Sequence, residues 1–376
     1  MRKIQMVDLH SQYEKIKSEI DEAMSDVIKS TAFIKGAKVG EFANELASYL
    51  DVKHVIPCGN GTDALQIAIM SLGLKPSDEI ICPDFTFIAS AEVIGLLGYR
   101  PVFVDVDYDS FNVTAKNIEQ AISIKTKAII PVHLFGQAAP MEAILEIAKK
   151  YDLYIIEDTA QAIGADYIFS DERKQKLGTI GTIGCTSFFP SKNLGCYGDG
   201  GALFTNDDEL AERLKMIANH GMKERYHHDI LGVNSRLDTI QAAILSIKLK
   251  YLDQYEQARQ QAAKRYDKAF EDIDDLLIPK KETFSTHVYH QYTLKVKGGK
   301  RDELKTFLEQ NDIPAMIYYP VPLHKQKAFL PIARQGGTLN VSETLAEQVL
   351  SLPMHTELDE EQQTYIINKV REFFSK

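Results

Sequence analysis

The sequence predicts an α/β protein built on a mostly parallel sheet with helices on both faces. Short apolar runs alternate with amphipathic helical patterns from about residue 39 to residue 245, and several runs end at Pro, Asp or Gly. Such alternation is typical of parallel strands joined by helices. Because ligands bind at the carboxyl ends of the strands in these sheets, functional side chains are expected directly after the strands.

The expected elements follow in chain order. Apolar residues from Val39 to Leu50 share one helical face, and the strand-like run His54–Pro57 follows them. A glycine-rich turn then leads into a helix that extends to Leu72. Buried strands are predicted at 80–82, 102–106, 128–132 and 154–156, with helices near 88–97, 114–122 and 141–151. Asn206, followed by Glu209, predicts a capping box at the start of the next helix.

The last third of the chain changes character. It predicts a long helical region near 238–271, a strand at 290–296, a helix near 301–310, a strand at 315–319 and a final helix near 359–374. This pattern is typical of a smaller α+β unit. We therefore predict a large domain over residues 1–254 and a small C-terminal domain over residues 255–376.

Composition narrows the class of protein. The 376 residues are 44% hydrophobic and 26% charged, which is typical of a folded soluble chain. A net charge of −10 argues against a nucleic-acid partner but leaves room for an anionic small substrate. The four cysteines form no CxxC pair, and the most apolar stretch, 88–106, is interrupted by charges. We expect a cytoplasmic protein with reduced thiols, no signal peptide and no membrane span.

Two motifs follow predicted strands. Gly59-Asn60-Gly61-Thr62-Asp63-Ala64 opens a helix and is typical of a phosphate site, although it also satisfies the G-x-G-x-x-A pattern of dinucleotide folds and suits a plain tight turn. Asp158 follows a buried strand. It is either a helix cap or a carboxylate that keeps a pyridinium nitrogen protonated. No GxxxxGK[ST] pattern occurs, which argues against nucleotide hydrolysis.

Two further segments carry cations. Lys192 lies in Phe188-Phe189-Pro190-Ser191-Lys192, between an apolar strand and a glycine-rich turn, where partial burial would lower its pKa as a Schiff-base lysine requires. A surface lysine is the simpler alternative. The run from His220 to Arg236 is the most cationic stretch of this acidic chain. Its adjacent His227 and His228 have no ligand partners at metal spacing, so we expect anion recognition and no metal.

Together these motifs resemble the StrS/DegT family of sugar aminotransferases, which depend on pyridoxal 5′-phosphate (PLP). The resemblance runs from Val7-Asp8-Leu9 to Ser351-Leu352-Pro353-Met354-His355 and includes Asn234-Ser235-Arg236. It implies the aspartate-aminotransferase architecture, PLP-dependent transferase fold type I. It also implies a homodimer whose active sites are shared between subunits.

The resemblance implies a role for each matching residue. The cofactor-binding residues are Gly61, Thr62, Phe87, Asp158, Gln161, Ser187, Lys192 and Asn234. Among them, Lys192 is the catalytic lysine that holds the cofactor and moves the proton, and Asp158 pairs with the pyridine nitrogen. Asn234 is expected to reach the phosphate from the second subunit. The substrate-binding residues are His227, His228, Arg236, Tyr318, Tyr319 and His324.

The resemblance also implies a reaction. Lys192 is intact, whereas dehydratases of the family carry histidine there, so transamination from L-glutamate to a nucleotide-linked keto sugar is expected. The motifs are closest to the branch that makes UDP-2-acetamido-3-amino-2,3-dideoxy-glucuronate for surface polysaccharide such as O-antigen. Tyr318 and His324 depart from that branch, so amination at C4 of a 4-keto-deoxy sugar stays open. A NAD-dependent oxidoreductase and a non-catalytic regulatory relative are the remaining alternatives.

Overall fold

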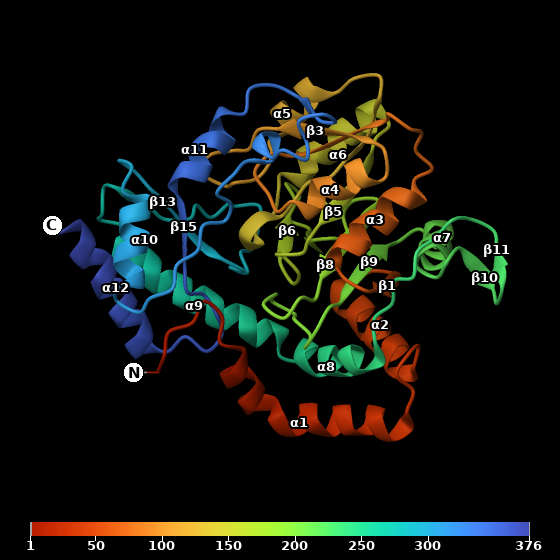
Figure 1. The fold of residues 1–376 in the computed structure, drawn as a ribbon, viewed down its shortest axis with the longest axis horizontal. Coiled ribbons are helices and arrows are strands. Elements are labelled where there is room, and N and C mark those ends of the chain that lie inside the picture. Colours follow the sequence, from red (N-terminus) through yellow and green to blue (C-terminus); the bar gives the residue numbers. More distant parts are fainter. Residues whose placement is uncertain (1, 376) are drawn as a thin grey trace.

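The computed structural model describes residues 2–375, and its centre is an eight-stranded sheet between layers of helices (Figure 1). The strands, in spatial order, are β1 (His54–Cys58), β9 (Gly201–Thr205), β8 (Ile183–Ser187), β5 (Tyr154–Asp158), β4 (Thr126–Ile129), β2 (Glu79–Pro83), β3 (Arg100–Val104) and β14 (Arg334–Gln335). Strand β9 is antiparallel to both neighbours, and the other neighbouring pairs are parallel. The predicted mostly parallel α/β sheet is therefore confirmed.

Helices cover both faces because successive strand residues point to opposite sides of a sheet. Ile81 and Val102 face α5 (Ala115–Ala121) and α6 (Met141–Tyr151). A neighbouring apolar core contains residues of α2 (Ala37–Leu50) and α8 (Thr239–Leu249). Ile80 and Phe103 face the other side, which is covered by α3 (Gly61–Ser71), α4 (Ala89–Leu96) and α7 (Asp208–Ala218). Both faces are buried, as a parallel sheet requires.

A second, antiparallel sheet lies beside the first. It contains β12 (Leu276–Leu277), β13 (Tyr292–Val296) and β15 (Val349–Leu352). Its apolar core is shared with α9 (Leu252–Phe270), α10 (Arg301–Glu309) and α12 (Glu360–Phe374). Strand β14 lies between α10 and β15 in the chain but joins the large sheet. The domain boundary near residue 255 stays a prediction.

Several predicted elements differ from the structure. The helical region near 238–271 is two helices, α8 and α9, separated at Lys250 and Tyr251. The predicted strand at 315–319 is wrong, because that segment makes only an isolated bridge between Met316 and Ser351 and turns toward the cavity described below. The cap of α7 is Asp207, whose side chain accepts from the Leu210 N–H, and not Asn206.

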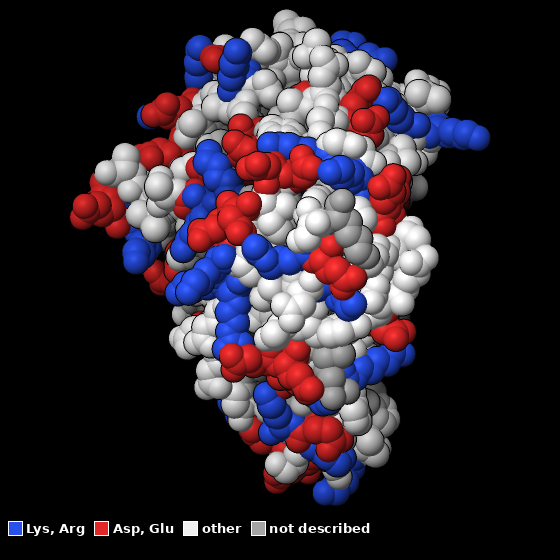
Figure 2. Space-filling model, turned by 90° about the vertical axis from the view of Figure 1, so that its left-hand side faces the viewer, with Lys and Arg blue, Asp and Glu red and all other residues white. Residues whose placement is uncertain are grey.

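Three further elements complete the fold. Helix α1 (Leu9–Ser30), which the sequence reading did not predict, runs along α8 and buries Ile16 and Ile20 (Figure 1). The hairpin of β10 (Met222–Glu224) and β11 (His227–His228) projects from the body of the molecule (Figure 1). On the face in Figure 2, acidic and basic side chains are interspersed. Within residues 2–375, no helix is both long and apolar enough to cross a membrane.

Candidate active site

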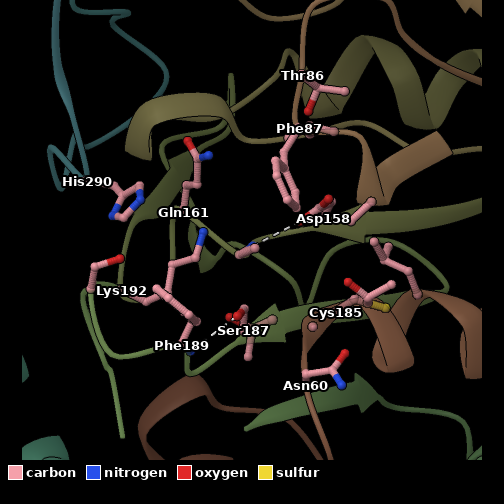
Figure 3. Close-up of a pocket in the computed structure, with 18 of the residues that line it drawn as sticks. Asn60, Thr86, Phe87, Asp158, Gln161, Cys185, Ser187, Phe189, Lys192 and His290 are labelled. Atoms are coloured by element: carbon pink, nitrogen blue, oxygen red, sulfur yellow. Dashed lines mark hydrogen bonds between the residues drawn. The ribbon is translucent and has the colours of Figure 1, made fainter. Parts of the chain in front are cut away.

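A cavity of about 660 Å³ opens beside the carboxyl ends of β5 and β8 (Figure 3). Segments that are far apart in the sequence meet there, as parallel strands lead one to expect. Many of the residues singled out from the sequence line it: Gly61, Thr62, Phe87, Asp158, Gln161, Ser187, Lys192, Tyr318 and Tyr319. The cavity is therefore the candidate active site.

One end of the cavity is the N-terminus of α3. Asn60 caps this helix, and its side chain accepts a hydrogen bond from the Asp63 N–H at 2.8 Å. The N–H groups of the first turn have no partner within a helix, so they suit an anion. A Cβ at Gly61 would lie 2.7 Å from the Cβ of Ser187, which shows how closely the two segments approach. This end of the cavity has the shape and the donors of a phosphate cradle.

Asp158 lies at the end of β5, and both of its carboxylate oxygens are fixed. The Ser90 hydroxyl donates to Oδ2 at 2.8 Å, and the Ala160 N–H donates to Oδ1 at 3.1 Å. Ser90 lies on α4 and is fully buried. The sequence reading missed it, since a serine within an apolar helix carries no local signal of a ligand. Two neutral donors thus orient an ionisable carboxyl group toward the cavity.

The neighbouring Glu157 has a structural role. Its buried carboxylate accepts hydrogen bonds from three backbone N–H groups of the 178–181 turn at 2.6 to 3.0 Å. It also lies 3.0 Å from Nε2 of buried His133, whose Nδ1 accepts the Ala139 N–H and so leaves the proton on Nε2. Glu157 therefore anchors the end of β5, and only its neighbour faces the cavity.

Lys192 extends into the cavity, and Figure 3 shows it between His290 and Gln161 on one side and Asp158 on the other. Desolvation lowers the pKa of Lys192 from 10.5 to about 8, although the negative charge of Asp158 partly opposes this shift. His290 also lines the cavity. Burial, Lys192 and Arg259 together hold the pKa of His290 well below its ordinary value, so this ring is neutral. With its lowered pKa, the Lys192 amine can act as a nucleophile and as a base near neutral pH.

The lowered pKa of Lys192 predicts a pH dependence for covalent capture of an aldehyde. Only the neutral amine can attack a carbonyl group, so the rate at which apoprotein captures PLP should rise with pH, reach half its maximum near pH 8 and level off above that pH. The measurement is the appearance of the visible absorption band after mixing, with a Lys192→Ala apoprotein as the background from surface lysines. A rate that keeps rising up to pH 10.5, the ordinary value, would contradict the burial argument.

The cavity wall also contains an oriented amide and an aromatic ring. Gln161 accepts the Phe135 N–H through Oε1 at 2.7 Å and donates from Nε2 to the Tyr319 hydroxyl at 3.0 Å. The second hydrogen on Nε2 is available to a ligand. Phe87 is 54% exposed, and its ring centroid lies 6.1 Å from that of Tyr319. An aromatic face left open beside a cavity suits stacking on a flat ring.

Four predicted site residues lie outside this cavity in their own chain: Asn234, Arg236, His227 and His228. Asn234 is exposed, and the two histidines are exposed on the β10–β11 hairpin. Arg236 lines a second cavity of about 390 Å³. Whether they serve the active site of a second subunit stays a prediction.

His324 also differs from its predicted place near the sugar. Its side chain is buried, does not line the cavity, and directs both ring nitrogens at carboxylates. In the part of the chain that the structure describes, no group of three or more His, Cys, Asp or Glu side chains is arranged to hold a metal ion. All four cysteines are buried and free.

The residues of the cavity fit PLP. The α3 cradle suits its phosphate, Asp158 suits a protonated ring nitrogen, and Lys192 suits covalent attachment at the aldehyde. A cavity with these groups at the carboxyl edge of this sheet defines a PLP-dependent aminotransferase of fold type I.

Comparisons with known proteins give the family. The model of the DegT/DnrJ/EryC1/StrS aminotransferase family matches residues 14–371, and the chain belongs to that family. A pleiotropic regulatory protein of Geobacillus stearothermophilus is 48% identical over 99% of this chain and 98% of its own length. The UDP-2-acetamido-2-deoxy-3-oxo-D-glucuronate aminotransferase of Pseudomonas aeruginosa is 45% identical over 95% and 96%. DesV of Streptomyces venezuelae, solved in complex with a ketimine intermediate, matches with a TM-score of 0.95 at 37% identity over 100% of both chains.

Membership of this family confirms the predicted fold class, the PLP cofactor and the aminotransferase chemistry. It also removes the nicotinamide-dependent alternative. The Gly59-Asn60-Gly61 turn, which raised that alternative, forms the start of α3 beside Ser187.

Proposed function

We propose that this aminotransferase moves the amino group of L-glutamate to the keto group of a sugar carried by a nucleotide. The acceptor that we infer is UDP-2-acetamido-2-deoxy-3-keto-glucuronate, aminated at C3, and the likeness to the Pseudomonas aeruginosa enzyme supports it. The structural observation that carries the proposal is a group of cations around Arg236 that suits an anionic substrate.

These cations line the second cavity. Lys35, Lys215, Lys223 and Arg236 share it with a single carboxylate, Glu212. Glu212 is already paired with Lys215 at 2.8 Å, whereas Arg236 makes no ion pair with any residue in 2–375. An arginine without a carboxylate partner can bind the carboxylate of a uronate in a bidentate manner.

The proposal requires a homodimer. Arg236, Asn234 and the β10–β11 hairpin lie outside the active-site cavity of their own chain. We infer that they complete the site of the partner subunit, where Asn234 would contact the phosphate and Arg236 the uronate. The hairpin projects from the body, which supports such a reach (Figure 1). We place this dimer in the cytoplasm, in the synthesis of surface polysaccharide.

Three residues of the cavity have tasks in this reaction. PLP, when bound, supplies the carbon that carries the amino group and a ring that withdraws electrons from it. Lys192 holds and returns the proton at its amino group, and the same lysine serves both halves because each half is the other in reverse. Asp158 holds a proton on the ring nitrogen. The neutral His290 adds no positive charge beside Lys192.

The alternative acceptor is a 4-keto-deoxy sugar nucleotide. Tyr318 precedes Tyr319 at a position where many relatives are expected to carry histidine, and both tyrosines line the cavity. The presence of Lys192, Asp158 and Gln161 in one cavity argues against the alternative of a non-catalytic regulatory relative. Nuclear magnetic resonance of the product formed from each keto sugar distinguishes C3 from C4 amination, and no amino sugar from either would reject the proposal.

Replacement of Arg236 by Ala should separate the two half-reactions. Loss of a charged partner for the uronate should raise the KM for the keto-uronate about tenfold to a hundredfold, with the glutamate half-reaction spared. Stopped-flow single turnovers measure the two halves separately. Arg173→Ala is the matched control, because that arginine is exposed and stacks on Phe169 away from both cavities. An equal loss with a neutral keto sugar would show that Arg236 does not bind the carboxylate.

A further inference from the structure

His324 connects two segments that each contribute an aromatic ring to the active-site wall. It lies in the short helix η2 (Leu323–Lys325), five residues after Tyr319. Its partner Asp84 follows β2 and lies three residues before Phe87. Tyr319 and Phe87 both line the cavity, with ring centroids 6.1 Å apart. A bond between Asp84 and His324 therefore fixes the position of these two segments relative to each other.

Three hydrogen bonds join the segments. The Asp84 carboxylate lies 2.7 Å from His324 Nδ1 and accepts the His324 backbone N–H at 2.8 Å. The Leu323 N–H donates to the Asp84 carbonyl at 3.0 Å. Asp84 is fully buried, and this burial raises its pKa although the bonds from His324 oppose the shift. A buried carboxylate that loses one of its two donors is destabilised, so the contact with the imidazole is a strong constraint.

The imidazole has no nitrogen left for a substrate. Its Nε2 lies 3.1 Å from Oε1 of Glu343 on α11 (Asn340–Gln348), and Lys325 pairs with the same carboxylate at 2.9 Å. The negative charge of Asp105 also raises the pKa of Asp84, and the Asp105 carboxylate accepts hydrogen bonds from the first turn of α11. Both ring nitrogens of His324 therefore contact carboxylates of the protein, and the side chain does not line the cavity.

We propose that His324 is a positioning residue for the cofactor site, which acts through Asp84 and Tyr319. The bond to Asp84 holds the 319–324 segment in place, and the Tyr319 hydroxyl accepts from Gln161 Nε2 at 3.0 Å. Gln161 faces the cavity with its second Nε2 hydrogen. The inference rests on the placement of PLP in this cavity and is independent of which sugar is the acceptor.

The test compares two amide side chains, Asn and Gln, in place of His324. In His324→Asn the side-chain nitrogen occupies the position of Nδ1 and can still donate to Asp84, whereas in His324→Gln it occupies the position of Nε2 and reaches only toward Glu343. Four single variants are compared: His324→Asn, His324→Gln, His324→Ala and Glu343→Gln. The full-length apoprotein of each is titrated with PLP, and binding is followed by fluorescence. Thermal unfolding confirms that each variant is folded.

We expect the Kd for PLP to rise about tenfold in His324→Ala and His324→Gln, the size of one lost hydrogen bond. His324→Asn and Glu343→Gln should bind PLP as the native chain does. Adding Tyr319→Phe to His324→Ala should give less than the product of the two single effects, because both changes act on Gln161. Equal affinity in all variants, or an Asn variant as weak as Ala, overturns the proposal. A Gln variant with native affinity, or a weakened Glu343→Gln, overturns the route through Asp84.

Discussion

Replacement of Lys192 by Ala is expected to abolish turnover while the fold persists. Removing the nucleophile and the base together should lower kcat by about a thousandfold or more, the scale of a lost general acid–base group. The visible absorption band of covalently held PLP should be lost as well. The fold should remain because Lys192 makes no side-chain hydrogen bond or ion pair within residues 2–375 and its amino group faces the cavity.

Three measurements separate this result from simple unfolding. Absorbance reports covalent attachment, single turnovers with L-glutamate report the chemistry, and thermal unfolding reports the fold. Lys174→Ala is the matched control, because that lysine is exposed on β7 (Lys174–Lys176). The Ala variant should be at least as stable as the native apoprotein, since it no longer buries an amine at a cost. A Lys192→Ala protein with native activity would exclude the proposed role.

The sequence predicted most of the residues that line the cavity because they follow strands in recognisable patterns. Asp158 follows an apolar strand, and Gly61 opens a helix directly after one. Such residues are placed by local structure, and the parallel sheet then collects them at one edge. For this reason the large sheet and the centre of its ligand site could be predicted from the sequence alone.

Other parts depend on distant contacts that no local pattern contains. Ser90 reaches Asp158 across 68 positions of the chain, and Asp84 reaches His324 across 240. His290 was assigned only to a strand, although its ring lines the cavity. The segment 315–319 has the residue types of a strand, but its backbone forms a single isolated β-bridge and no continuous pairing with another strand. Tertiary contacts override local propensity at these positions.

Asp158→Asn should give the second largest loss, with kcat lower by about a hundredfold or more. An amide cannot supply the negative charge that keeps a proton on the ring nitrogen, so the cofactor would withdraw electrons less strongly. The shape of the side chain is retained, and PLP should still attach to Lys192. The measurement is kcat beside the absorption band, which should persist with a slower response to L-glutamate.

Two neighbouring substitutions give this prediction its controls. Ser90→Ala removes one donor to Asp158 at 2.8 Å but keeps the charge, so its loss should be smaller than that of Asp158→Asn. Glu157→Gln should do the opposite and destabilise the fold, because its new amide hydrogens would face the backbone donors of the 178–181 turn. A folded Asp158→Asn enzyme with native kcat would show that the charge of Asp158 is not needed. Loss of stability without loss of kcat would assign Asp158 the anchoring role that we give to Glu157.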